Sequence, residues 1–110
     1  MTYECCKYKP EDMVEFVRDY LGPALKEQAP QVKLMIHDDQ KPLLAATMDA
    51  FGNDTKAMSM IDIVGFHWYG DHLQNYNELS AAVSRWPQKE FIGTEATDEA
   101  YWKQLDHFMQ

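Results

Sequence analysis

The stretch that decides the fold reads Glu90-Phe91-Ile92-Gly93-Thr94-Glu95-Ala96. Its apolar centre predicts a short buried strand, and Glu95 stands where that strand should end. A carboxylate is costly to bury without a partner, and α/β barrels place catalytic groups at the C-terminal ends of their parallel strands. By its position alone, Glu95 is better explained as a strand-end glutamate that turns to solvent, so the catalytic interpretation depends on the rest of the chain.

Two earlier stretches repeat this arrangement. Residues 31–36 and 61–66 are apolar enough for buried strands; the first runs into His37-Asp38-Asp39 and the second into His67-Trp68-Tyr69. Helical patterns lie between and around the strands, at 10–26, 42–50, 75–85 and 99–108. Alternation at this spacing predicts right-handed crossovers and a parallel sheet. The polar ends of the three strands are therefore expected side by side on one face.

Apolar residues at three- and four-residue spacing predict which side of each helix faces the sheet. Pro10 suits the first turn of a helix, and Gly22-Pro23 interrupts that helix before its last turn. The residues expected to face inward are Met13, Phe16, Val17, Tyr20 and Leu21 in the first helix and Leu79, Ala82, Val83 and Trp86 in the third.

Length and charge narrow the class of protein. A chain of 110 residues is enough for one small domain. Its formal charge of -8 argues against nucleic acid and against anionic membrane surfaces, because Lys and Arg dominate binding to phosphates. No stretch approaches the length of a membrane span, and residues 1–7 have no apolar core of a signal peptide. Cys5 and Cys6 are adjacent, so we expect free thiols or a partner cysteine outside this chain.

The polar strand ends suit glycoside hydrolysis. Trp68 and Tyr69 would form an apolar wall for a sugar ring, and Glu95 would attack the anomeric carbon. Retention requires a second carboxyl group about 5 to 5.5 Å away that protonates the leaving oxygen. Asp38 is the nearest candidate in the sequence.

A metal site is the competing interpretation. His37, Asp38 and Asp39 together with His67 or His72 offer suitable ligand atoms, but neighbours on a strand point to opposite faces. The chain has no HExxH or CxxC spacing and no glycine-rich phosphate loop, so we expect neither a metal nor a cofactor. Asn53-Asp54-Thr55 is an acceptor sequence for N-glycosylation, a pattern that is frequent by chance.

Four motifs carry a family likeness: Asp19-Tyr20-Leu21-Gly22-Pro23, Leu34-Met35-Ile36-His37-Asp38-Asp39-Gln40, His67-Trp68-Tyr69 and Thr94-Glu95-Ala96. In order and spacing they resemble the glucosylceramidases (acid β-glucosidases) of glycoside hydrolase family 30. The likeness runs from about residue 5 to residue 102. Each motif is short, but four in register are specific.

The resemblance implies a (β/α)8 barrel beside a β-sandwich. It implies a retaining glycosidase that splits glucose from glucosylceramide in the lysosome, within sphingolipid and lipid metabolism, without a cofactor and with an activator protein. The three strands would be the fifth to seventh of the barrel, and Glu95 the nucleophile. His67, Trp68 and Tyr69 would line the glucose pocket, and Asp38 would belong to the surrounding hydrogen-bond network. Cys5 or Cys6 would match a cysteine that follows the fourth strand.

The chain also departs from the family pattern. It lacks the Asn-Glu-Pro motif whose glutamate is the family's acid/base, and Thr97 stands where the family pattern has a cysteine. A complete barrel takes about 250 residues. We therefore expect residues 1–110 to be one segment of a glycosidase barrel, without a complete domain, carrying the nucleophile but inactive alone, since a general acid contributes about 10²- to 10⁴-fold.

Location and partners follow from the same expectation. The resemblance predicts a lysosomal or secreted protein, although this chain shows no signal peptide. Unpaired sheet edges predict self-association of the isolated chain. Two alternatives remain: a non-catalytic sugar-binding or regulatory module derived from the same barrel, and a free-standing three-stranded α/β domain without a function at this face.

Overall fold

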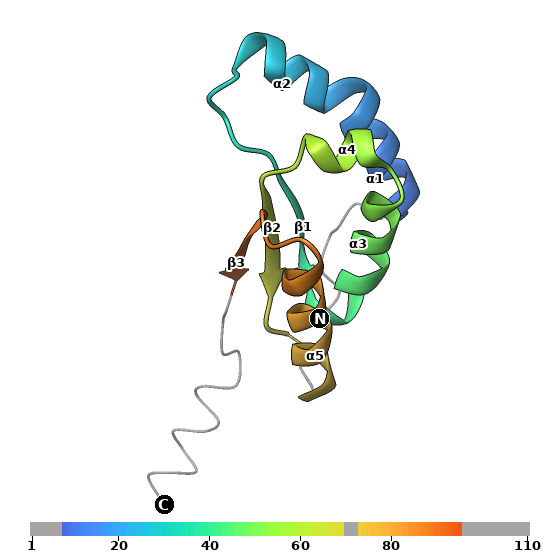
Figure 1. The fold of residues 1–110 in the computed structure, drawn as a ribbon, viewed down its shortest axis with the longest axis vertical. Coiled ribbons are helices and arrows are strands. Elements are labelled where there is room, and N and C mark those ends of the chain that lie inside the picture. The colour runs from blue at the N-terminus through green and yellow to red at the C-terminus, as the bar shows by residue number, and fades with distance from the viewer. Residues whose placement is uncertain (1–7, 70–72, 96–110) are drawn as a thin grey trace, which may run out of the picture.

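The computed structural model describes residues 8–69 and 73–95 (Figure 1). Within them, three parallel strands form one sheet in the order β1-β2-β3. Their bounds are Met35–Gln40 for β1, Ile63–His67 for β2 and Glu90–Glu95 for β3. The predicted α/β class with a parallel sheet is confirmed. The helix expected at 99–108, the two cysteines, His72 and Thr97 lie outside the described residues.

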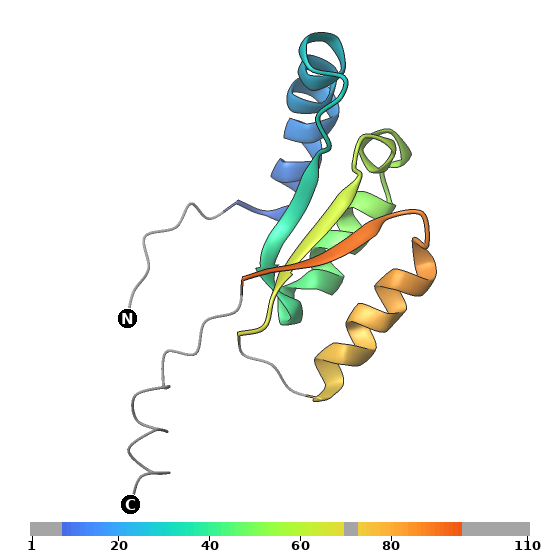
Figure 2. The ribbon, with the colours of Figure 1, turned by 90° about the vertical axis from the view of Figure 1, so that its left-hand side faces the viewer.

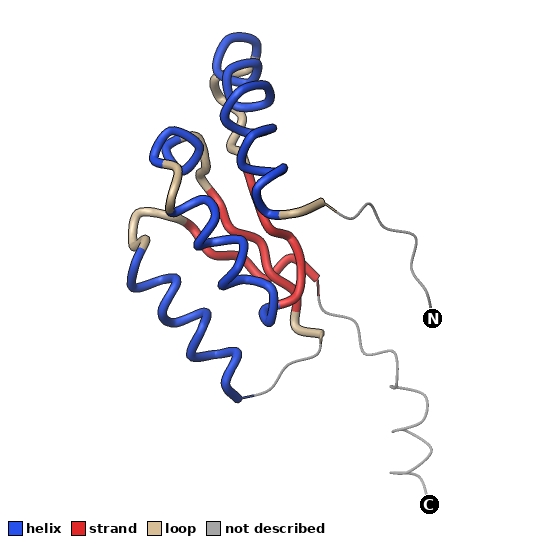
Figure 3. The backbone as a smooth tube through the Cα atoms, turned by 90° about the vertical axis from the view of Figure 1, so that its right-hand side faces the viewer, coloured by secondary structure: helices blue, strands red, loops and turns tan. Residues whose placement is uncertain are grey.

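The described helices all lie on one side of this sheet, as Figure 3 shows. Short α-helices flank a π-helical turn in the first helical segment, and a 3₁₀ turn precedes the second. The bounds are α1 Pro10–Phe16, η1 Val17–Leu21, α2 Gly22–Gln28, η2 Lys41–Leu43, α3 Leu44–Gly52, α4 Thr55–Ser59 and α5 Leu73–Arg85.

The first helical segment keeps its direction through Gly22-Pro23 by widening into a π turn. Pro23 has no N–H to donate, and the Gly22 N–H bonds to the carbonyl of Val17 across the π turn. A Cβ on Gly22 would lie 2.3 Å from Met60 Sδ and 2.7 Å from Val17 O. The absence of a side chain at Gly22 therefore lets α2 pack closely on the loop that leads into β2.

The core lies between the helix layer and one face of the sheet. Its largest fully buried side chains are Leu44, Met48, Phe51, Ile61 and Val64. Each side chain of this kind stabilises the fold by about 1.5–3 kcal/mol relative to an exposed one. Helix α3 supplies three of these five side chains, because its buried residues recur at three- and four-residue spacing.

Three helical residues predicted to face inward are exposed: Phe16, Tyr20 and Val83. Phe16 and Tyr20 stack on each other with ring centroids 6.3 Å apart, while Val14 and Val17 make the contact with the core. The prediction was wrong because a spacing pattern gives the width of an apolar stripe but not its rotation. Here the side that carries Val14 and Val17 meets the core, and α1 packs on α3.

The first strand begins four residues later than expected and continues through the polar residues to Gln40. Its apolar run predicted burial on both faces, yet only Leu34 and Ile36 are buried, and Met35 is 39% exposed. Ile92 of β3 is 40% exposed. Figure 2 shows the reason: the described helices lie behind the sheet, and no described segment covers its other face, called the open face below.

Candidate active site

The C-terminal ends of the three strands meet at one edge of the sheet, and two of them carry an extra residue. Strand pairing passes from His37 to Asp39 in β1 and from Gly93 to Glu95 in β3, so Asp38 and Thr94 are the inserted residues. His37 and Asp38 have φ angles of 73° and 48°. Such left-handed backbone costs of order 1–3 kcal/mol and gathers at functional sites, and bulges redirect side chains.

The two inserted residues meet each other across β2. The Thr94 hydroxyl donates a hydrogen bond of 2.7 Å to Asp38 Oδ1, and His67 Nε2 lies 3.1 Å from the same oxygen. Because an ionised carboxylate only accepts, the imidazole must carry its proton on Nε2. Glu95 Oε2 lies 3.6 Å from this nitrogen, which is too long for a hydrogen bond. His67 therefore lies between two carboxylates.

Asp38 is held in its ionised form. The hydrogen bond from Thr94, and next the one from His67, lower the pKa of Asp38 below its ordinary value, although partial burial opposes them. A general acid in a glycosidase needs a raised pKa instead. Asp38, the sequence candidate for the second carboxyl group, is thus better suited to orienting His67 than to protonating a leaving group.

His37 points the other way, toward the helix layer. Its Nε2 lies 3.2 Å from the carbonyl of Gln40 and its Nδ1 lies 3.2 Å from Thr47 Oγ1. Burial lowers the pKa of His37. His37 and Asp38 therefore do not converge, and the described residues contain no group of three or more His, Cys, Asp or Glu side chains placed to hold a metal ion.

The aromatic pair follows directly after β2. Trp68 is 48% exposed, and the ring of Tyr69 meets the ring of His67 edge-on, with centroids 6.1 Å apart. Trp68 follows His67 directly in the chain, and its exposed indole offers a flat apolar surface of the kind on which a sugar ring can stack. All five predicted site residues (Asp38, His67, Trp68, Tyr69 and Glu95) lie at the C-terminal edge.

Three residues at this edge were given no role by the sequence analysis: Thr94, which it quoted only as part of a motif, Gly65 and Lys41. A Cβ on Gly65 would lie 2.7 Å from Met35 Sδ, 3.2 Å from Thr94 Cγ2 and 3.4 Å from Asp38 Cα, so Gly65 leaves room for both inserted residues. Lys41 is 3% exposed and donates to the carbonyl of His67. No sequence pattern signals a β-bulge here, and without the bulges these contacts cannot be anticipated.

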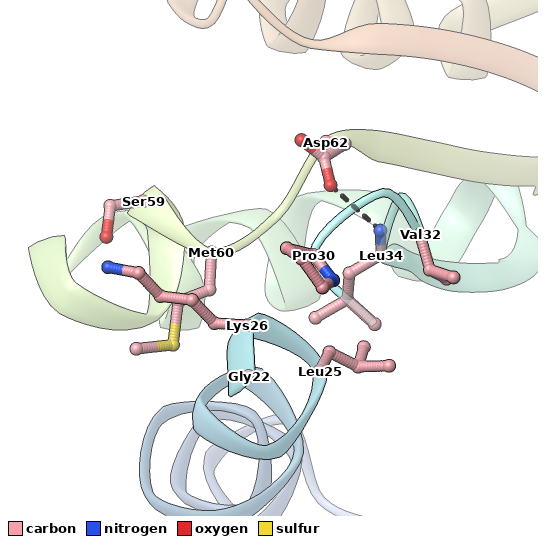
Figure 4. Close-up of a pocket in the computed structure, with 9 residues that line it drawn as sticks. All are labelled: Gly22, Leu25, Lys26, Pro30, Val32, Leu34, Ser59, Met60 and Asp62. Carbon is pink, nitrogen blue, oxygen red and sulfur yellow. Dashed lines mark hydrogen bonds between the residues drawn. The ribbon is translucent and has the colours of Figure 1, made fainter. Parts of the chain in front are cut away.

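One cavity lies at the opposite end of the sheet. It has a volume of about 290 Å³ and lies between α2 and the segments that enter β1 and β2 (Figure 4). Asp62 there accepts a hydrogen bond of 2.8 Å from the Leu34 N–H. Its lining residues are Gly22, Leu25, Lys26, Pro30, Val32, Leu34, Ser59, Met60 and Asp62, none of which is a predicted site residue. The open face, rather than this cavity, presents the candidate site.

Two further sequence expectations concern the surface. Asn53 is exposed just after α3, which makes it accessible, and its glycosylation stays a prediction. Among the described helices, none has the length and apolar character that a membrane crossing needs.

Comparison with known proteins places this chain in a family. The profile of the glycosyl hydrolase family 30 TIM-barrel domain matches residues 1–108. The chain is 35% identical over 96 residues to putative glucosylceramidase 3 of Caenorhabditis elegans, covering 86% of this chain and 18% of the relative. It is 29% identical over 104 residues to lysosomal acid glucosylceramidase of Mus musculus, covering 93% and 20%. The chain thus spans about a fifth of the length of these relatives, and it belongs to the TIM-barrel domain family of glycosyl hydrolase family 30.

Proposed function

We propose that this chain carries the nucleophile side of a retaining β-glucosidase site, with Glu95 as the nucleophile and glucosylceramide or a related β-glucoside as the substrate. The observation that carries the proposal is the cluster at the C-terminal edge. Glu95 ends β3 and lies 3.6 Å from a histidine that an ionised Asp38 holds, in a chain of a glycoside hydrolase family.

The proposed reaction has two steps. A Glu95 carboxylate oxygen bonds to the anomeric carbon while the bond from that carbon to the leaving oxygen breaks, and the leaving oxygen takes a proton from a general acid. Water then attacks the anomeric carbon and gives a proton to the group that acted as general acid, while the bond between that carbon and Glu95 breaks. This releases glucose and returns both groups to their starting protonation states. His67, held by Asp38, stays beside Glu95 during both steps, and Trp68 and Tyr69 support the sugar ring.

The general acid in this proposal is not Asp38, because the low pKa of Asp38 leaves it without a proton to give. We assign the acid to a carboxyl group on a strand that pairs with the free edge of β1, where the family resemblance has the fourth barrel strand. The 110-residue chain alone is then expected to hydrolyse glucosides very slowly, since general acid catalysis contributes about 10²- to 10⁴-fold.

The test uses a chimera in which this chain replaces the matching segment of the mouse lysosomal acid glucosylceramidase. Glu95→Gln should lower kcat/KM for a β-glucoside by more than about 10³-fold, because an amide cannot form the glycosyl ester. Glu90→Gln is the matched control, since Glu90 lies on the same strand at its other end. Similar turnover of the two variants would contradict the proposal.

A binding module would give a different pattern. If Glu95→Gln left turnover unchanged while Trp68→Ala weakened binding of a β-glucoside to the isolated chain, the sugar-binding alternative would replace catalysis. Trp68 is the natural probe, because about half of its surface is exposed and it follows His67 directly in the chain.

The proposal extends to location and partners. The mouse relative is named a lysosomal acid glucosylceramidase, and we propose a lysosomal or secreted location, sphingolipid metabolism and an activator protein for the protein to which this chain belongs. We also propose that the isolated chain self-associates through β1 and β3, which are the edges of the described sheet. Light scattering that gave a mass near 12.8 kDa at all concentrations would contradict self-association.

A further inference from the structure

Lys41 is a buried lysine at the C-terminal edge of the sheet. It begins the η2 turn directly after β1, and only 3% of its surface is exposed. A buried ammonium is costly unless polar or aromatic groups compensate it. Its Nζ donates a hydrogen bond of 3.3 Å to the carbonyl of His67, and it lies 5.3 Å from the ring centroid of Phe66 and 5.1 Å from that of Tyr76.

These three contacts connect the Lys41 ammonium to strand β2 and to helix α5. Phe66 and His67 are the last two residues of β2, and Tyr76 belongs to α5. Gln40, the residue before Lys41, pairs with His67 in the sheet. The ammonium therefore binds the end of β2 from the helix side, while the His67 imidazole contacts Asp38 on the open face.

We propose that Lys41 is a positioning residue that fixes the end of β2 and so holds the His67 imidazole between Asp38 and Glu95. Lys41 does not touch the reacting atoms. It acts through the His67 backbone, with the Phe66 and Tyr76 rings holding the ammonium in place. This inference rests on the proposed function, because the histidine that Lys41 positions is the one assigned to orient the nucleophile.

The matched comparison is with Lys89. Its Nζ also donates to backbone carbonyls, those of Met58 at 2.9 Å and Ile61 at 2.6 Å. These carbonyls precede β2, at the opposite end of the same strand. Lys41→Met and Lys89→Met therefore each remove an ammonium that binds main-chain oxygen, but only Lys41→Met removes it beside His67.

The experiment measures the 110-residue chain and needs no turnover. Amide hydrogen exchange should accelerate in Lys41→Met at residues 65–67 by about tenfold or more, the factor expected when a charged hydrogen-bond donor is lost. Ring ¹⁵N signals of His67, assigned with His67→Gln, should lose the signature of the bond to Asp38. Lys41→Arg should restore both readouts, because a guanidinium keeps the charge, the donors and the stacking on aromatic rings.

A purely structural lysine would give another result. If Lys41→Met and Lys89→Met changed exchange equally throughout the sheet and left the His67 ring signals unchanged, positioning would be refuted. Tyr76→Leu covers the case in which Lys41→Met does not fold, since Tyr76 is half-exposed and its loss should give a smaller effect in the same direction; unchanged His67 signals in that variant would also refute it. If Lys41→Met changed the His67 signals as expected, but the chimera with the unsubstituted chain showed no turnover, only the proposed function would be contradicted.

Discussion

The two ends of the sheet use similar residue types for different purposes. At the end where the strands begin, Lys89 donates to the loop before β2, Asp62 caps the Leu34 N–H, and Lys33 pairs with Glu90. Each carboxylate there has a backbone donor or a lysine as its partner. At the end where the strands finish, Asp38 and Glu95 share one histidine. Charges that are neutralised locally stabilise a fold, whereas two carboxylates around one imidazole are an arrangement for chemistry.

Backbone geometry differs between the two ends in the same way. Pairing is regular where β2 and β3 begin, and both register shifts lie near the strands' C-terminal ends. The inserted Asp38 and Thr94 hydrogen-bond to each other, so the irregularity brings two side chains together that a regular sheet would separate.

Substitution of the aspartates Asp38 and Asp62 should give the largest difference between the two ends of the sheet. In the chimera, Asp38→Asn should lower kcat by about 10- to 100-fold, the range seen when a group that orients a catalytic residue is lost, with little effect on unfolding. Asp62→Ala should instead affect stability and leave kcat unchanged. It removes the acceptor of a backbone N–H and should cost about 1 kcal/mol of stability without changing kcat. Equal effects of the two substitutions on kcat would remove the distinction between the two ends.

Alanine substitutions at Gly65 and Gly93 test the close packing at the bulges. Gly65→Ala should destabilise the chain by about 1–3 kcal/mol, because its Cβ would meet Met35 Sδ at 2.7 Å and crowd Thr94 and Asp38. Gly93→Ala adds a Cβ no closer than 3.6 Å to the Phe66 ring, so we expect it to be neutral or slightly stabilising. Chemical denaturation of both variants measures this difference. A Gly65→Ala variant as stable as Gly93→Ala would contradict the close packing at the bulges.

A pH titration of stability tests His37, which faces the helix layer at the end where the strands finish. Burial lowers the pKa of His37 from its ordinary value of 6.5, so below pH 6.5 the unfolded chain binds a proton that the folded chain does not. The stability that neutral His37 contributes should therefore fall as the pH drops from 6.5 toward the folded pKa, by at most about 1.4 kcal/mol per pH unit. Asp38 does not affect this pH window, because its pKa is lowered below its ordinary value of 3.8.

His37→Asn isolates this slope, because asparagine tolerates the left-handed backbone at this position. The variant should unfold with a flatter pH dependence between pH 6.5 and 5, measured by denaturant midpoints. An unchanged slope would show that His37 takes up its proton in the folded chain as readily as in the unfolded one.

The smallest effect is expected at the start of the strands. Lys33 and Glu90 are both exposed, and the pair raises the pKa of Lys33, so its contribution is lost only as the pH rises through that raised value. Lys33→Met should leave neutral-pH stability within experimental error, since exposed ion pairs contribute little. A clear loss of stability would show that this end depends on its charges more than its exposure implies.

Sequence reasoning found the three strands, their parallel order and the polar residues that end them, because apolar runs of strand length bounded by turn residues leave few alternatives. It placed Phe16, Tyr20 and Val83 on the wrong side, since spacing cannot say how far a helix is rotated against its sheet. It located Asp38, His67 and Glu95 correctly at one edge, but not the bulges that join Asp38 to Thr94. Those bulges depend on contacts across β2, including the space beside Gly65, and no local pattern encodes them.

The most direct test of the account is covalent trapping of the nucleophile. A 2-deoxy-2-fluoro-β-glucoside with a good leaving group should react with the chimera. Its anomeric carbon should form a bond to a Glu95 carboxylate oxygen as the leaving group departs, and this intermediate should persist because its hydrolysis is slow. Peptide mass spectrometry should locate the added sugar on Glu95. A label on another residue, or turnover of the natural substrate without any label on Glu95, would contradict the proposed role of this strand end.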